Sequence, residues 1–283
     1  MLMGHCHLFP GGRGESRRDE FGIPGTSEHL HGFIEACGFD RAHVLAPHED
    51  PETHNLEACI RGGQDGLEWL LRQPFVGVDD AAELIPAATI QPDSPDAAQK
   101  LARARAAGVR TLKVHPLIMR LDALDAACEP FFREAERARM PTVYHTGGGD
   151  WGWPTEYGSV EICAELAARY PGLPLLMAHC GVFGDVDEFE QAVSACEAHA
   201  NLFLDVTAAT LRVGEVRWRA ALQRIAPERI IYGTDYPWVT VSSVDRELEF
   251  FESLGLSAED RAGILGDNLW ALCLRVPTVT DEE

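Results

Sequence analysis

Eight short apolar segments, separated by longer stretches of helical periodicity, constrain the fold of this 283-residue chain more than any other feature. The predicted strands are Leu2–Leu8, His43–Ala46, Ile85–Gln91, Thr111–His115, Thr142–Thr146, Leu175–His179, Leu202–Thr207 and Ile230–Thr234. Strands that alternate with helices pair in parallel and connect through right-handed crossovers. Eight such units predict one α/β domain with the fold of a (β/α)8 TIM barrel, regular or distorted.

Capping and helix-breaking residues bound the predicted helices. Ser27 caps the first helix, Gly108 ends another, and Pro141 follows a third. The predicted helices are Glu28–Cys37, Pro95–Ala107, Asp122–Arg139, Ser159–Tyr170, Asp185–His199, Arg212–Ile225, Ser243–Leu254 and Ala258–Leu265. Their alternation with the strands supports closure of the sheet into a barrel.

The barrel is expected to occupy residues 1–276, followed by a short acidic tail at residues 277–283. The structural alternative is an open doubly wound sheet, which usually carries a glycine-rich phosphate loop after its first strand. The segment Gly11-Gly12-Arg13-Gly14 lacks that spacing, and no predicted helix follows it directly. We therefore favour the barrel.

Three predicted loops are long, and each follows a strand: Phe9–Thr26 after the first, Pro47–Gly66 after the second and Gly147–Gly158 after the fifth. In a barrel, loops that follow strands lie at the C-terminal face, where active sites are built. Connections at the opposite face, such as Ala107-Gly108-Val109, are short. This asymmetry favours an enzyme.

Composition limits the partners and the compartment. The formal net charge of -21 makes the surface repel phosphate backbones, so nucleic-acid binding is not expected. We find no apolar run of about 18 residues and no secretory leader, which predicts no membrane association. Eight cysteines without a Cys-x-x-Cys pair indicate buried thiols in a reducing cytoplasm. The expected partner is a small-molecule substrate; the assembly state is open, and a homodimer is one alternative.

Five residues of metal-binding type stand at the ends of predicted strands. His5 and His7 lie one residue apart, so both face the same side of a regular strand. His145, His179 and Asp235 each end a later strand. In a closed barrel these ends surround one mouth, and neutral imidazoles with a carboxylate bind divalent ions. The joint arrangement predicts a metal site.

Short motifs surround these candidate ligands: His5-Cys6-His7, Val143-Tyr144-His145-Thr146-Gly147, Met177-Ala178-His179-Cys180-Gly181, Tyr232-Gly233-Thr234-Asp235-Tyr236-Pro237 and, near the end of the chain, Gly266-Asp267-Asn268-Leu269-Trp270. Together the motifs resemble the amidohydrolase superfamily. More narrowly they resemble its amidohydrolase-2 branch, which includes aminocarboxymuconate-semialdehyde decarboxylase and related hydrolases. The resemblance covers nearly the whole chain and is more specific for fold and metal than for substrate.

The resemblance implies one divalent ion held by His5, His7, His145 and Asp235, with His179 beside it as a ligand or an outer group. Zn2+ suits imidazole and carboxylate ligands best, and Mn2+ and Fe2+ also fit. Relatives usually carry Asp before the first His, where this chain has Gly4. Support for the first pair of ligands must therefore come from elsewhere in the chain.

Asp235 and His179 are the predicted catalytic residues. Water bound to a divalent ion in such a site has its pKa lowered from about 15.7 towards about 7. Asp235 would accept the proton and return it to the leaving group, and His179 would polarise the substrate carbonyl and stabilise the oxyanion. The predicted reaction is hydrolysis of an amide, lactone or related carbonyl bond in a small molecule.

Other polar and aromatic residues are candidates for the pocket. We expect His115, Trp151 and Trp238 to contact the substrate. Lys113 shares a strand face with His115 and has two interpretations. It is either buried against a carboxylate or, as in binuclear relatives, carboxylated and bridging two metals; we favour the first and therefore one ion.

Three alternatives to metal-dependent hydrolysis remain open. The first is non-oxidative decarboxylation of an aromatic or unsaturated acid, in which the carboxylate protonates carbon. The second is metal-free lactone hydrolysis, which the presence of all five ligand positions disfavours. The third is a non-catalytic barrel, which is disfavoured because degenerate enzymes usually lose ligands.

Overall fold

The computed structural model describes residues 1–8, 26–46, 66–73, 84–148, 156–182 and 186–277. All strand pairs are parallel, and the strands form one sheet in the order β8-β7-β6-β5-β4-β3-β2-β1-β9. Their bounds are β1 Leu2–His7, β2 Arg41–Leu45, β3 Leu84–Thr89, β4 Thr111–Val114, β5 Thr142–His145, β6 Leu175–Ala178, β7 Leu202–Asp205, β8 Ile230–Ile231 and β9 Gly233–Tyr236. Every predicted strand has a counterpart.

The last two strands are halves of the single eighth strand that the sequence predicts. β8 pairs with β7 and β9 pairs with β1, so together they close the ring. The interruption falls at Tyr232, whose amide donates to Ile264 O at 3.0 Å instead of to a neighbouring strand. The (β/α)8 prediction is confirmed, whereas the continuous strand Ile230–Thr234 is wrong because this hydrogen bond leaves the sheet.

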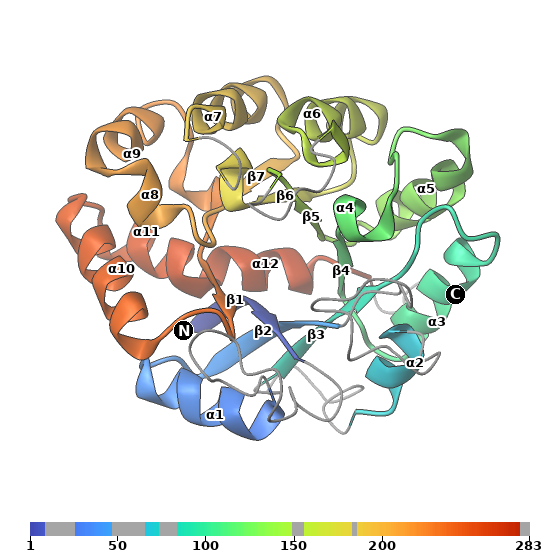
Figure 1. Cartoon of the computed structure of the whole chain (residues 1–283), viewed down its shortest axis with the longest axis horizontal. Helices are drawn as coiled ribbons and strands as arrows, with labels where there is room; N and C mark the ends of the chain where they lie inside the picture. The colour runs from blue at the N-terminus through green and yellow to red at the C-terminus, as the bar shows by residue number, and fades with distance from the viewer. Residues whose placement is uncertain (9–25, 47–65, 74–83, 149–155, 183–185, 278–283) are drawn as a thin grey trace.

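The helices surround the sheet as a ring in Figure 1. Their bounds are α1 Ser27–Ala36, α2 Gly66–Leu71, α3 Ala97–Ala106, α4 Pro116–Met119, α5 Glu129–Arg137, α6 Val160–Arg169, α7 Glu188–Ala198, α8 Thr210–Val213, α9 Glu215–Ala221, α10 Val241–Ser253, α11 Ala258–Ala262 and α12 Asn268–Leu274. Short 3-10 segments lie at Ala126–Cys128, Glu156–Gly158, His179–Gly181 and Pro227–Arg229, and a π-helical segment lies at Gly263–Asp267.

Several predicted helix bounds need correction. The predicted helix Arg212–Ile225 is divided into α8 and α9 by Gly214, whose φ of 80° ends the first helix. The regular part of the predicted helix Asp122–Arg139 begins only at Glu129, because a 3-10 turn capped by Asp125 precedes it. The helices α2 and α4 were not predicted; each has six residues or fewer, too short for a clear periodic pattern.

Helix α12 crosses the middle of the ring in Figure 1 and closes the end of the barrel where the strands begin. Its buried residues Leu269, Leu272 and Cys273 pack in one cluster with interior strand residues, including Leu2 and Ile231. The chain before α12 approaches β1 closely, since a Cβ on Gly266 would lie 2.4 Å from the Leu2 amide nitrogen. The opposite end of the barrel therefore remains for the polar strand ends.

A buried carboxyl group lies outside the barrel, between α10 and the interrupted eighth strand. The Tyr232 hydroxyl donates to Glu247 Oε2 at 2.8 Å, and Phe39 and Phe251 pack against the tyrosine ring. Burial raises the pKa of Glu247 from 4.5 to about 7, although the hydrogen bond from Tyr232 opposes this. The carboxylate form is thus costly in the folded protein.

This burial predicts that stability falls as the pH rises from about 4.5 to 7. In that range the folded chain holds the Glu247 proton while the unfolded chain releases it, and the difference amounts to about 3 kcal/mol above pH 7. Glu247→Gln keeps an acceptor for Tyr232 without the charge. In urea unfolding we expect its advantage over wild type to grow from about 1 kcal/mol at pH 5.5 to about 3 kcal/mol at pH 8.

The matched control is Glu249→Gln, which removes an exposed carboxylate two residues away on the same helix. We expect its unfolding free energy to follow wild type at both pH values. An advantage of Glu247→Gln that is the same at pH 5.5 and pH 8 would contradict the assignment.

Two further observations bear on the sequence predictions. In the described part of the chain, no helix has the length and apolar character needed to cross a membrane. Of the predicted acidic tail, residues 278–283 lie outside the described residues.

Candidate metal centre

Three predicted ligands from β1 and β9 converge at the ends of their strands. The ligand atoms of His5, His7 and Asp235 all lie within 4.8 Å of one another. His7 Nε2 is 3.2 Å from Asp235 Oδ1, and His5 Nε2 is 3.6 Å from the same oxygen. Two imidazole nitrogens and one carboxylate oxygen form a donor set that suits a divalent transition ion.

Irregular backbone, rather than regular alternation, brings these side chains together. The register of β1 shifts between Met3 and Cys6, and His5 has a left-handed φ of 49°. Asp235 in β9 likewise has a φ of 63°. Regular alternation predicts His5 and His7 on one face of a strand. In the structure the register shift in β1 breaks that alternation, and the two rings nevertheless lie 5.2 Å apart.

Asp205, at the end of β7, is a site residue that the sequence analysis missed. His5 Nδ1 donates to Asp205 Oδ2 at 2.8 Å, and both side chains are fully buried. This carboxylate supplies the support that Gly4 cannot give. A side chain at Gly4 has no room, since its Cβ would lie 2.2 Å from Tyr232 O. In the sequence, the polar residues Asp205 and Thr207 at the end of the apolar run Leu202-Phe203-Leu204 could have indicated it.

His179 follows β6 in a tight turn and lies beside the three converging ligands. Its Nδ1 donates to Thr207 O at 3.0 Å, and its ring is 5.1 Å from that of His5. Burial lowers the pKa of His179 to about 4, so the ring is neutral near pH 7. A neutral ring whose Nδ1 carries the proton has its lone pair on Nε2.

His145 and His115 continue the row of imidazoles along the mouth of the barrel. The His145 ring is 4.7 Å from His179 and stacks on His115 at 3.8 Å. His145 is absent from the group whose ligand atoms converge, so its role as a ligand stays a prediction. His115 Nδ1 accepts from the Ile118 amide at 3.4 Å, where it caps α4. That contact favours a proton on Nε2 of His115.

Lys113 is a buried cation beside these groups. Its Nζ lies 3.4 Å from His5 Nε2, and burial lowers its pKa to about 8 against the attraction of Asp235 and Asp205. Burial also opposes ionisation of Asp235. The hydrogen bond from His7 and the neighbouring imidazoles outweigh burial, so the pKa of Asp235 is lowered and the group is a carboxylate. The interior therefore holds charges of both signs.

Of the predicted aromatic contacts, Trp238 is placed near the site. Its ring lies 5.2 Å from that of His7 with an edge-on orientation, and its amide donates to Asp235 O at 2.9 Å. Trp151 lies outside the described residues, as do most residues of the three long loops. The substrate-contact role of both tryptophans stays a prediction.

The cysteines next to two candidate ligands are buried thiols. Burial raises the pKa of Cys6 to about 12 and that of Cys180 well above its ordinary value. Cys6 packs in the core between the sheet and the outer helices, and Cys180 Sγ donates to Asp205 O at 3.2 Å. Neither group is available as a thiolate nucleophile.

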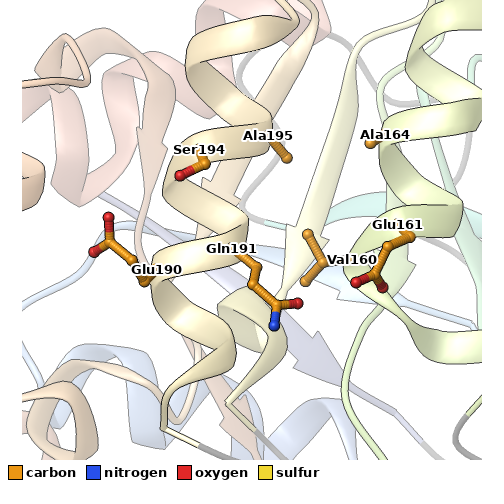
Figure 2. A pocket seen from close by; sticks show the side chains of 7 residues that line it. All are labelled: Val160, Glu161, Ala164, Glu190, Gln191, Ser194 and Ala195. Atoms are coloured by element: carbon orange, nitrogen blue, oxygen red, sulfur yellow. The ribbon is translucent and has the colours of Figure 1, made fainter.

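A surface groove between α6 and α7 is separate from this site. Figure 2 shows its lining side chains on the two helices: Val160, Glu161, Ala164, Glu190, Gln191, Ser194 and Ala195. The lining contains none of the candidate ligands, all of which stand at strand ends.

Solved structures share this fold over nearly the whole chain. 5-Carboxyvanillate decarboxylase from Sphingomonas paucimobilis is 13% identical with a TM-score of 0.72, and the match covers 98% of this chain and 99% of that one. A zinc-bound amidohydrolase from Burkholderia multivorans is 16% identical with a TM-score of 0.68 and the same coverage. A Pseudomonas putida protein, provisionally named a 2-pyrone-4,6-dicarboxylic acid hydrolase, is 19% identical with a TM-score of 0.66 and 97% coverage of both chains.

Sequence comparison gives the family. No curated protein matches the chain significantly. The family model described as Amidohydrolase matches residues 78–268, which is more than half of the chain. The matched range contains His145, His179 and Asp235, while His5 and His7 precede it. The chain therefore belongs to the amidohydrolase-2 branch of the amidohydrolases and is an enzyme of that type.

Proposed function

We propose that this enzyme is a metal-dependent hydrolase that cleaves an amide, lactone or related carbonyl bond of a small molecule. The observation that carries the proposal is the convergence of His5, His7 and Asp235 within 4.8 Å at the mouth of the barrel. The family is metal-dependent, and a related fold from Burkholderia multivorans is described with bound zinc. The proposal takes one Zn2+ as the cofactor, with Mn2+ and Fe2+ as alternatives.

The donor set fits a divalent ion. Burial lowers the pKa of His5 well below its ordinary value, so this imidazole offers a lone pair rather than a positive charge. Asp235 is ionised and adds one negative charge. A divalent ion held by His5, His7 and Asp235 would make hydroxide available near neutral pH and would polarise a carbonyl oxygen.

The chain's own residues would then divide the remaining tasks. The Asp235 carboxylate accepts the proton of the attacking water and returns it to the leaving group. The Nδ1 proton of His179 is committed to Thr207 O, so Nε2 of this residue is suited to accept a proton or bind an ion. His115 is better suited to donate a hydrogen bond to the substrate, because its Nδ1 accepts from Ile118.

One observation favours decarboxylation as a second candidate function. Lys113 places a buried ammonium 3.4 Å from His5 Nε2, where it would attract a substrate carboxylate. In that reaction the bond from carbon to the carboxylate breaks and carbon dioxide leaves, and Asp235, after taking up a proton from solvent water, would pass it to the electron pair left on carbon. The fold is shared with a decarboxylase as well as with hydrolases.

Metal content and product analysis test these proposals together. Protein purified without chelator is expected to contain about one divalent ion per chain and to lose activity with a chelator. A panel of lactones, amides and hydroxybenzoates, assayed for acid release and for carbon dioxide, separates the two reactions. A metal-free, chelator-insensitive enzyme would overturn the metal-dependent mechanism, and about two ions per chain would favour a bridging Lys113.

A further inference from the structure

The end of strand β7 and the segment that follows it supply none of the predicted ligands but contact two of them, through Asp205 and Thr207. Asp205 accepts from His5 Nδ1 at 2.8 Å, and the main-chain oxygen of Thr207 accepts from His179 Nδ1 at 3.0 Å. A carboxylate and a carbonyl can only accept, so each imidazole carries its proton on Nδ1. In the neutral form of each ring, Nε2 then holds the lone pair.

Asp205 is itself held in position by hydrogen bonds. Its Oδ1 accepts from the Thr207 amide at 3.1 Å and from the Thr207 hydroxyl, which leaves Oδ2 directed at His5. All of these groups are buried, so water does not compete for them. The segment Asp205-Val206-Thr207 thus forms a rigid acceptor unit rather than a single contact.

The same segment also holds the turn that carries His179. His179 and Cys180 have left-handed φ values of 68° and 51°. Thr207 O binds the ring of the first residue, and Asp205 O accepts from the Sγ of the second at 3.2 Å. A left-handed backbone conformation is unfavourable for residues other than glycine, and it persists where surrounding contacts hold it in place.

Glycine in β9 leaves the space that this arrangement needs. A Cβ on Gly233 would lie 2.2 Å from Thr207 Oγ1 and 2.6 Å from His5 Cβ. Neither Thr207 Oγ1 nor His5 Cβ could keep its position if residue 233 carried a side chain. Strands β1, β7 and β9 are therefore packed to place the acceptor unit against the His5 ring.

We propose that Asp205 and Thr207 are positioning residues which set the tautomer and orientation of His5 and His179, so that both Nε2 atoms face the ion site. This inference rests on the proposed metal-dependent function. Groups of this kind behind metal-ligating histidines commonly change metal affinity by about 10- to 100-fold.

The first test uses metal-free protein. Ring nitrogen NMR shifts, assigned with His5→Asn and His179→Asn and recorded at a pH where the rings are neutral, are expected to show the proton of both rings on Nδ1. In Asp205→Asn the His5 ring is expected to populate both tautomers, while His179 remains as in wild type. A neutral wild-type His5 ring that carries its proton on Nε2 rather than on Nδ1 would overturn the inference, even if the protein bound no ion.

The second test measures Zn2+ affinity by competition with a chromophoric chelator. Asp205→Asn is expected to bind about 10- to 100-fold more weakly than wild type. Thr207→Val, which loses the hydroxyl, should weaken Zn2+ binding. Thr207→Ser, which keeps the hydroxyl, should bind Zn2+ about as tightly as wild type. Asp245→Asn, an exposed carboxylate on α10, is the control and should bind as wild type does.

The outcomes separate the two proposals. If wild type binds no Zn2+, the proposed function fails, and the tautomer measurement still decides the role of β7. If wild type binds Zn2+ and folded Asp205→Asn binds within about threefold of it, the inference fails while the function stands. Should Asp205→Asn not fold, equal affinities of Thr207→Val and Thr207→Ser would overturn the inference.

Discussion

Asp235→Asn is expected to lower kcat/KM by about 100-fold or more for any substrate that the panel identifies. The substitution keeps the size of the side chain but removes the carboxylate, which is the proposed proton acceptor and one of the three converging ligands. Asn cannot take up the proton of an attacking water near neutral pH. The measurement is steady-state kinetics on protein whose metal content has been determined.

Metal analysis distinguishes the two roles of this residue. If Asp235→Asn carries about one ion per chain and remains about 100-fold slower, the carboxylate moves protons. If activity returns in full when excess ion is added, Asp235 serves only as a ligand. Normal turnover of the metal-loaded variant would contradict the proton-transfer role, and Asp245→Asn is the charge-matched control on the outer face of α10.

Most of the fold could be predicted because strand and helix periods are local signals. The strands β1 to β7 begin and end within two residues of their predicted bounds. The break at Tyr232 could not be predicted, since it depends on a hydrogen bond to Ile264, more than thirty residues away. The split at Gly214 had a signal in the sequence, because glycine within a helical pattern commonly ends a helix.

The candidate site was predictable in its members but not in its geometry. Polar residues at the ends of apolar strands identified His7, His145 and Asp235 from the pattern alone. The convergence of three of the five ligands depends on left-handed φ values at His5 and Asp235. The alternation of side chains along a regular strand does not predict such backbone angles. Asp205 was missed because its partner, His5, lies 200 residues earlier in the chain.

Gly4→Ala is expected to destabilise the protein by about 3 kcal/mol or more, because the added methyl group meets main-chain atoms that cannot rotate away. Its Cβ would lie 2.2 Å from Tyr232 O and 3.5 Å from Gly233 Cα. Relief requires β1 and β9 to separate, which would also move His5 and His7 away from Asp235. Urea unfolding measures the first effect, and Zn2+ competition measures the second.

Gly32→Ala is the matched control for this substitution. Gly32 lies on the exposed side of α1, where a built Cβ meets nothing within 4 Å, so alanine should stabilise the helix by about 0.5–1 kcal/mol. If alanine lowers the free energy of unfolding at position 4 and raises it at position 32, the loss at Gly4 is explained by the contact with the Tyr232 carbonyl. Wild-type stability and Zn2+ affinity in Gly4→Ala would instead mean that β1 and β9 tolerate a side chain here. An aspartate at position 4 would then also be compatible with the fold, and lack of space there would no longer explain why Asp205 supports His5.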